Sequence, residues 1–119
     1  MFNEKKGKLL RIYIGEHTRH EGRPLYEWLL LQARELHMSG VTVLRGLEGY
    51  GASTRIHTAK IIEISGNLPV VVELVDTAEK IEKFLSHAES VVTGGLATIE
   101  DVDIRFYRAH PGEQPGTVS

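Results

Sequence analysis

A short glycine-rich run in the first half of the chain, Arg45 to Gly51 (RGLEGYG), holds the residue types best suited to binding an anion. Gly46, Gly49 and Gly51 allow the backbone to approach a ligand closely and to turn N–H groups toward phosphate oxygens. The run is neither a Walker A loop nor a dinucleotide-binding fingerprint, because no Gly-Lys-Ser/Thr follows it and no helix pattern begins there. Two interpretations stay open: a phosphate-contacting loop, or glycines that let a strand bulge and turn.

Basic side chains gather in three parts of the sequence. They lie at the start (Lys5, Lys6, Lys8, Arg11), around the glycine run (Arg45, Arg55, Lys60) and near the end (Arg105, Arg108). The net charge is nevertheless −2, and general nucleic-acid binding usually needs a basic surface, so we expect no nucleic-acid partner. Whether these groups bind an anion depends on which of them converge in space.

Histidines provide an alternative chemistry. His17, His20 and His57 lie in expected loops, and imidazole is a common metal ligand. Their spacing matches no regular zinc motif, so they are either metal ligands or exposed loop residues without a ligand role. The chain has no cysteine, which excludes disulfides and cysteine-based metal or nucleophile chemistry.

Acidic residues give no catalytic constellation. Asp101 and Asp103 share a strand face with Arg105, which favours a charge ladder on a solvated strand over acid–base work. No serine–histidine–acid spacing is present. We therefore predict no catalytic residue; a small ferredoxin-like isomerase with His57 as its base is a third alternative that rests on the fold alone.

The first half of the chain shows strand, helix and strand patterns. Residues 8–15 alternate as a strand does, and a polar loop follows. A helix is expected from Pro24, which suits a first helical position, to the neighbourhood of Gly40, which can take the left-handed capping conformation. Residues 41–46 predict the second strand.

The second half repeats this plan after a long connection. Residues 59–64 are expected to return as a strand-like arm, and residues 70–76 predict a strand buried on both faces. Asp76 is the expected cap of a second amphipathic helix. The last strand is expected over 97–108, and the Pro- and Gly-rich residues 109–119 as a disordered tail.

This order predicts a ferredoxin-like βαββαβ sandwich of the α+β class. Its four-stranded antiparallel sheet would carry both helices on one face and an extended loop between strands two and three. The first strand offers the helices either Leu10, Ile12 and Ile14 or Leu9, Arg11 and Tyr13. Either set is too apolar to leave in water, which predicts subunit association through the sheet.

The domain is expected to span 8–108, after a short N-terminal extension at 1–7. No apolar run approaches the roughly 18 residues of a membrane span, and the lysines near the N-terminus precede no signal-peptide core. We therefore expect a cytoplasmic protein that is not embedded in a membrane.

Five segments carry a resemblance to a known family: LLRIYIGE (9–16), RPLYEWLL (23–30), GVTVLRGLEGYG (40–51), LPVVVELVDT (68–77) and DVDIRFYR (101–108). With the order of elements, they resemble the PII-like signalling superfamily, and more closely its uncharacterised "domain of unknown function" branch. The resemblance implies a non-enzymatic homotrimer that needs no cofactor. It also implies that an adenine nucleotide, or another small effector, binds in clefts between subunits.

The resemblance further implies a partner and particular site residues. In PII-like proteins the loop between the second and third strands docks on a target, often a membrane transporter or an enzyme, and this branch is often encoded beside a fluoride-channel-type membrane protein. The implied ligand-binding residues are Arg45, Gly46, Gly49, Tyr50, Gly51, Arg105 and Arg108, and the partner-facing ones Arg55 and His57, within a loop at 46–60. Two departures leave another nucleotide or anion open: Tyr50 lies too early for the modifiable tyrosine of classical members, and 93–98 lacks their lysine.

Overall fold

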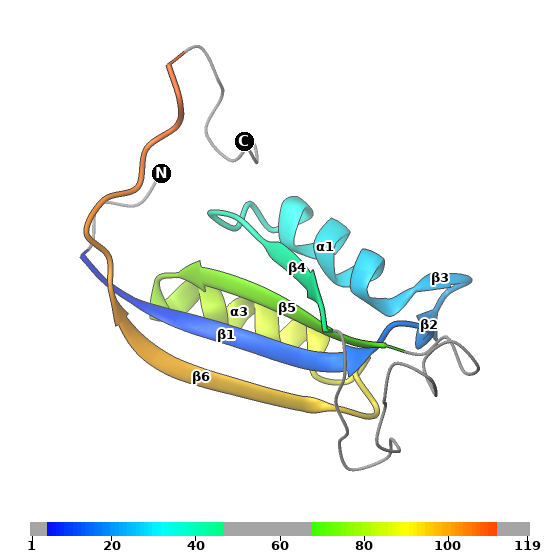
Figure 1. Cartoon of the computed structure of the whole chain (residues 1–119). Helices are drawn as coiled ribbons and strands as arrows, with labels where there is room; N and C mark the ends of the chain where they lie inside the picture. Colours follow the sequence, from blue (N-terminus) through cyan, green and yellow to red (C-terminus); the bar gives the residue numbers. More distant parts are fainter. Residues whose placement is uncertain (1–4, 47–67, 112–119) are drawn as a thin grey trace.

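The computed structural model describes residues 5–46 and 68–111. In chain order the elements are β1 (Lys6–Gly15), β2 (Arg19–His20), β3 (Arg23–Pro24), α1 (Leu25–Glu35), β4 (Thr42–Arg45), β5 (Pro69–Asp76), α3 (Ala78–Ala88) and β6 (Leu96–Asp103). The main sheet has four antiparallel strands in the order β4-β5-β1-β6, and both helices lie on one side of it (Figure 1). The predicted ferredoxin-like α+β sandwich is confirmed. None of these helices is long and apolar enough to cross a membrane.

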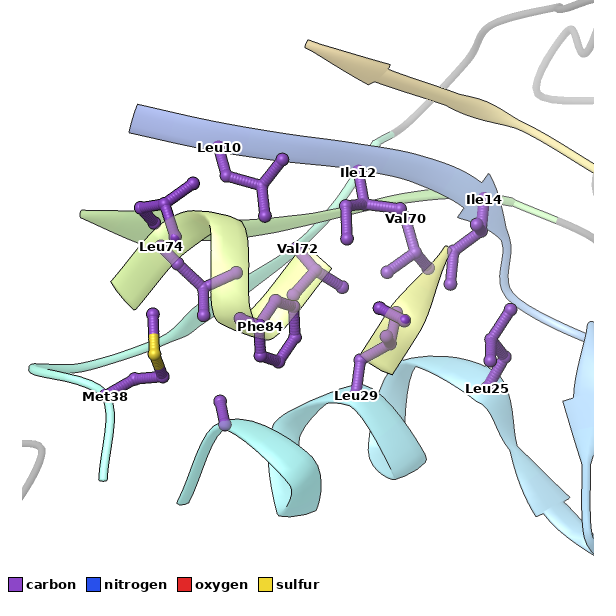
Figure 2. Close-up of a cluster of buried hydrophobic side chains, with 13 residues drawn as sticks. Leu10, Ile12, Ile14, Leu25, Leu29, Met38, Val70, Val72, Leu74 and Phe84 are labelled. Atoms are coloured by element: carbon purple, nitrogen blue, oxygen red, sulfur yellow. The ribbon is translucent and has the colours of Figure 1, made fainter. Parts of the chain in front are cut away.

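The core lies between the helices and the side of the sheet that faces them. Strand β1 is central, with Ile12 opposite Val72 of β5 and Ala97 of β6. Its even-numbered residues from Leu10 to Ile14 are buried, and Figure 2 shows their side chains pointing from β1 into the cluster that contains Phe84 of α3. The other core members are Leu25, Leu29, Ala33, Met38, Val70, Val72, Leu74, Ile81 and Ala88. Of the two predicted sets of β1 residues, Leu10, Ile12 and Ile14 are therefore the set that meets the helices.

Strand β5 is buried on one face, not on both as predicted. Its residues alternate strictly between buried and half-buried positions. The reason is that both helices pack on the same side, so Val71, Glu73 and Val75 point to the open face of the sheet. The near-continuous apolar run therefore has one face in the core and another that no helix or strand among residues 5–46 and 68–111 covers.

Helix α1 begins and ends differently from the prediction. Pro24 is its cap rather than its first helical residue, with an extended ψ of 137°. At the other end His37, not Gly40, takes the left-handed conformation, with φ 56°. Its N–H bonds to the Arg34 carbonyl, and the Met38 N–H bonds to the Ala33 carbonyl, which is the Schellman pattern. The early stop sends Met38 into the core, where it is 8% exposed.

The cap of α3 is Thr77, not the predicted Asp76. The Thr77 side chain accepts a hydrogen bond from the Lys80 N–H at 3.3 Å. Asp76 closes β5 and is fully buried. Its carboxylate accepts hydrogen bonds from the N–H groups of Thr77 and Ser39, each at 2.8 Å. Asp76 therefore ties the connection between α1 and β4 to the end of β5.

The last strand is shorter than the predicted 97–108. It ends at Asp103 because its hydrogen-bonding partner β1 begins at Lys6, directly opposite. One further bond joins the Ile104 N–H to the Lys5 carbonyl, and residues 104–111 then follow without a strand. Arg105 and Arg108 consequently lie beyond the sheet.

The predicted polar loop after β1 contains a small hairpin. Strands β2 and β3 pair His20 with Arg23. The two residues between them, Glu21 and Gly22, both have positive φ, at 52° and 78°. This is the geometry of the type I′ turn that suits two-residue hairpin loops.

Replacing Asp76 tests its double hydrogen bond. The variant Asp76→Ala leaves two N–H groups without their acceptor, and we expect the free energy of unfolding to fall by about 2–4 kcal/mol. Urea denaturation followed by circular dichroism measures this. The control is Asp103→Ala, which removes only an exposed ion pair with Lys6 and should match the wild type. Equal losses in both variants would contradict this role for Asp76.

Two glycines offer a matched test of backbone strain. Gly95 has φ 142°, and a Cβ added there would lie closer to the Tyr13 carbonyl oxygen than van der Waals contact allows. A Cβ added at Gly40 meets no heavy atom within 4 Å. We expect Gly95→Ala to destabilise the fold by about 1–3 kcal/mol, and Gly40→Ala to have little effect. Thermal and urea melts compare them; indistinguishable midpoints would show that Gly95 is not constrained.

Candidate functional site at one end of the sheet

Four strand termini meet at one end of the sheet, which we call the loop-base end. Gly15 closes β1 opposite Pro69, which opens β5. At the same end Arg45 closes β4 opposite Val70, and β6 opens opposite Tyr13. The antiparallel register thus brings together the chain segments that precede and follow residues 47–67.

Arg45, a predicted ligand-binding residue, has a partner at this end. Its side chain is 62% exposed, and its guanidinium forms an ion pair with the carboxylate of Glu16, whose side chain is 14% exposed. The other carboxylate oxygen of Glu16 lies 3.9 Å from Nε2 of His17. Glu16 is also fixed through its backbone, because its N–H bonds to the Leu68 carbonyl at 2.8 Å. The positive charge of Arg45 is therefore held in place by a well-anchored acid.

Gly46 continues the sheet beyond β4. Its N–H donates to the Pro69 carbonyl at 2.7 Å. If the Gly46 N–H were to donate a hydrogen bond to a phosphate, its bond to the Pro69 carbonyl would first have to break. The other predicted loop residues, Gly49, Tyr50, Gly51, Arg55 and His57, together with the expected arm at 59–64, lie outside the described residues.

Arg105 and Arg108 follow the opposite end of the sheet. The eight residues of β6 carry the chain from the loop-base end to Asp103 beside Lys6. At about 3.3 Å per residue, this strand separates its two ends by roughly 23 Å. The Arg108 guanidinium lies over the Phe106 ring at 4.4 Å, and Phe106 is 70% exposed. Within one chain the structure does not bring these arginines to Arg45.

The predicted histidine ligands are placed near the hairpin. The His20 ring meets the Trp28 ring edge-on, with centroids 5.1 Å apart, and the His17 side chain is 60% exposed. Within residues 5–46 and 68–111, no group of three or more His, Cys, Asp or Glu side chains is placed to hold a metal ion. His57, the third member of the metal hypothesis, lies outside the described residues.

Comparison with known proteins identifies the family. Residues 7–104 match the family described as DUF190, Uncharacterized ACR, COG1993. The chain belongs to the DUF190 family. A UPF0166 protein of Aquifex aeolicus is 42% identical over 101 residues, which cover 85% of this chain and 95% of the relative. Another from Methanocaldococcus jannaschii is 34% identical over 100 residues, covering 83% and 92%.

The fold of this DUF190 chain is similar to that of solved PII-like proteins. CPII, a nitrogen regulatory PII-like protein from Thiomonas intermedia K12 solved with ADP, AMP and bicarbonate, superposes with a TM-score of 0.63 at 14% identity, over 83% of this chain and 88% of CPII. A putative PII-like signaling protein from Thermus thermophilus gives 0.59 at 17% identity, over 84% and 91%. The fold is PII-like, as the resemblance implied.

The open face of the DUF190 sheet carries an apolar row near the loop-base end. Paired residues project to the same side, so the register aligns Leu44, Val71, Tyr13 and Leu96 across all four strands. Leu44 is 48% exposed, Tyr13 37% and Leu96 57%. This apolar row is a contiguous hydrophobic strip that no part of the described chain covers fully.

A charged network lies directly beside the apolar row. Nε of Arg11 donates to Glu73 at 2.9 Å, and Nη1 donates to Glu100 at 2.6 Å, so the network joins β5, β1 and β6. These two hydrogen bonds, led by that to Glu73, raise the pKa of Arg11. Sequence reasoning did not identify the network, although the cross-strand register of a ferredoxin-like sheet would have placed Glu73 beside Arg11.

The far end of the sheet has an open groove between β1, β6 and the start of α3. Its lining residues are Lys6, Gly7, Lys8, Ala78, Asp101, Val102 and Asp103. Both lysines are paired, Lys6 with Asp103 and Lys8 with Asp101. The hydrogen bond from Lys8 lowers the pKa of Asp101. The predicted charge ladder is thus found in another form: Asp101 and Asp103 pair with lysines of β1, whereas Arg105 lies beyond the end of β6.

Proposed function

We propose that this protein is a non-enzymatic regulator that binds a phosphate-bearing effector, an adenine nucleotide or a related anion. The domain at 8–108 would bind the effector, and the segment between β4 and β5 would transmit the signal to a partner. The observation that carries this proposal is the fold likeness to CPII over 83% of this chain and 88% of CPII, because CPII was solved with ADP and AMP. Arg45 at the loop-base end, whose side chain is 62% exposed, would supply a phosphate-binding group.

The position of the basic residues favours a site between copies of the chain. Arg45 lies at one end of the sheet, whereas Arg105 and Arg108 follow the other. A nucleotide that contacts both groups therefore needs a neighbouring subunit to supply one of them.

The open face of the sheet supports association between copies of the chain, and the resemblance to PII-like proteins makes a homotrimer the proposed assembly. Its apolar row would leave water if the sheets of neighbouring copies packed together. The adjacent Arg11 is compatible with burial, since Glu73 and Glu100 already accept hydrogen bonds from its guanidinium. Closed symmetric assembly would then place each loop-base end beside another subunit.

The target of such a regulator would be a cytoplasm-facing protein, and the family resemblance makes a membrane transporter or channel the leading candidate. Arg55 and His57 would contribute to docking from the segment at 46–60. The metal-binding alternative would use His57 with His17 and His20.

Calorimetry with purified protein tests the effector. We expect ATP, ADP or AMP to bind, and Arg45→Gln to weaken binding about tenfold or more, as loss of a charge-assisted hydrogen bond implies. Arg105→Gln and Arg108→Gln should weaken it as well. The control is Arg34→Gln, which removes the same charge from the exposed surface of α1. The same titrations are carried out with cyclic dinucleotides and with divalent metal ions. Binding of metals alone, lost on replacing His17 and His57, would favour the alternative instead.

Light scattering coupled to size exclusion tests the assembly. We expect a mass of three 13.3 kDa chains for the wild type. Leu96→Asp places a charge in the apolar row and should dissociate the trimer. The matched control is Ile99→Asp on the same strand, because Ile99 pairs with Leu10 and so projects to the opposite side. A monomeric wild type, or equal behaviour of both variants, would contradict assembly through the open face.

A further inference from the structure

The ion pair between Glu16 and Arg45 places an acid where an anionic ligand would act. Guanidinium groups bind carboxylates and phosphates through the same planar set of N–H donors. Nη2 of Arg45 is already bonded to Oε2 of Glu16. A phosphate that approached this guanidinium would meet a competing hydrogen-bond acceptor and the repulsion of a nearby negative charge.

The scaffold holds Glu16 more firmly than it holds Arg45. Glu16 follows the central strand directly, and its N–H is bonded to the Leu68 carbonyl. Its side chain is 14% exposed, whereas that of Arg45 is 62% exposed. Arg45 also belongs to β4, a four-residue strand at the edge of the sheet. Opening of the pair would therefore move the Arg45 side chain rather than that of Glu16.

The register explains why the two side chains meet. Arg45 pairs with Val70, and Val70 pairs with Ile14, so Arg45 and Ile14 project to the same side of the sheet. Glu16 lies two residues beyond Ile14 at that end. A second base stays close to the carboxylate, since Nε2 of His17 is 3.9 Å from Oε1 of Glu16. Glu16 would thus keep a neighbouring imidazole if Arg45 left.

We propose that Glu16 is an internal competitor of the effector: its carboxylate holds Arg45 in the ligand-free protein, and a phosphate group must displace it. This inference rests on the proposed function, because it takes Arg45 as an effector contact. Glu16 then sets the affinity of the site without touching the ligand. Because Arg45 is the last residue of β4, the exchange of its partner occurs where the chain leaves the sheet.

Titration of the full chain with ADP tests this role. Glu16→Gln removes the charge and keeps the size of the side chain, and we expect the Kd for ADP to fall about three- to tenfold. In the Arg45→Gln background the same change should bring no such gain, because the competitor then has nothing to hold. The control is Glu82→Gln on the exposed side of α3, which alters the net charge equally and should leave the Kd unchanged.

A second variant separates competition from misfolding. Glu16→Asp keeps the charge but withdraws the carboxylate by one methylene, so we expect a smaller gain in affinity. Thermal melts establish that each variant is folded. Unchanged or weaker ADP binding by folded Glu16→Gln and Glu16→Asp would overturn the inference, as would a gain that persists without Arg45.

The outcomes also distinguish this inference from the proposed function. If the wild type binds ADP and Arg45→Gln weakens it, but Glu16→Gln has no effect, only the competitor role fails. If the wild type and every variant bind none of ATP, ADP, AMP and the cyclic dinucleotides, the proposed function fails, and the competitor role fails with it.

Discussion

The whole structure depends on the two unlike environments of the central strand β1. Its backbone is hydrogen-bonded along both edges, to β5 and β6, so only its faces remain to be satisfied. Both helices cover the same face, where Leu10, Ile12 and Ile14 are buried. The apolar row and the Arg11 network on the other face follow from this one-sided cover. Core, open face and loop-base end are therefore all arranged around one strand.

Much of this fold could be predicted from the sequence, because strand alternation and helical spacing are local patterns. The order of the two helices and the four strands of the main sheet, and the common side of the helices, were predicted correctly, whereas the β2–β3 hairpin was not predicted. Element ends were not, since they are set by distant partners. Helix α1 stops where Met38 enters the core, which overrides the glycine signal at Gly40. Strand β6 stops where β1 supplies no further partner, so an alternating pattern beyond Asp103 was misleading.

The candidate site also has one part that the sequence could predict and another that it could not. Arg45 could be found by residue type, because an arginine before a glycine run is suited to an anion. Its pairing with Glu16 could not, since the two are separated by α1 and β4 along the chain and meet only through the register of β5. The residue pattern also did not show that Arg45 and Arg105 lie at opposite ends of the sheet. The prediction placed Arg105 within a strand that ran to 108, whereas β6 ends at Asp103.

The hydrogen bonds at the loop-base end also bear on how this family can vary. The Gly46 N–H bonds to the Pro69 carbonyl, and the Leu68 carbonyl accepts from Glu16, so the residues that flank 47–67 are joined to the sheet and to each other. The two ends of that segment are therefore held near each other by hydrogen bonds that lie outside it. Doubling the length of a flexible loop costs only about 0.6 kcal/mol. Insertions and deletions between Gly46 and Leu68 should therefore leave the sheet intact, so the length and sequence of this segment can change without a change in the scaffold that flanks it.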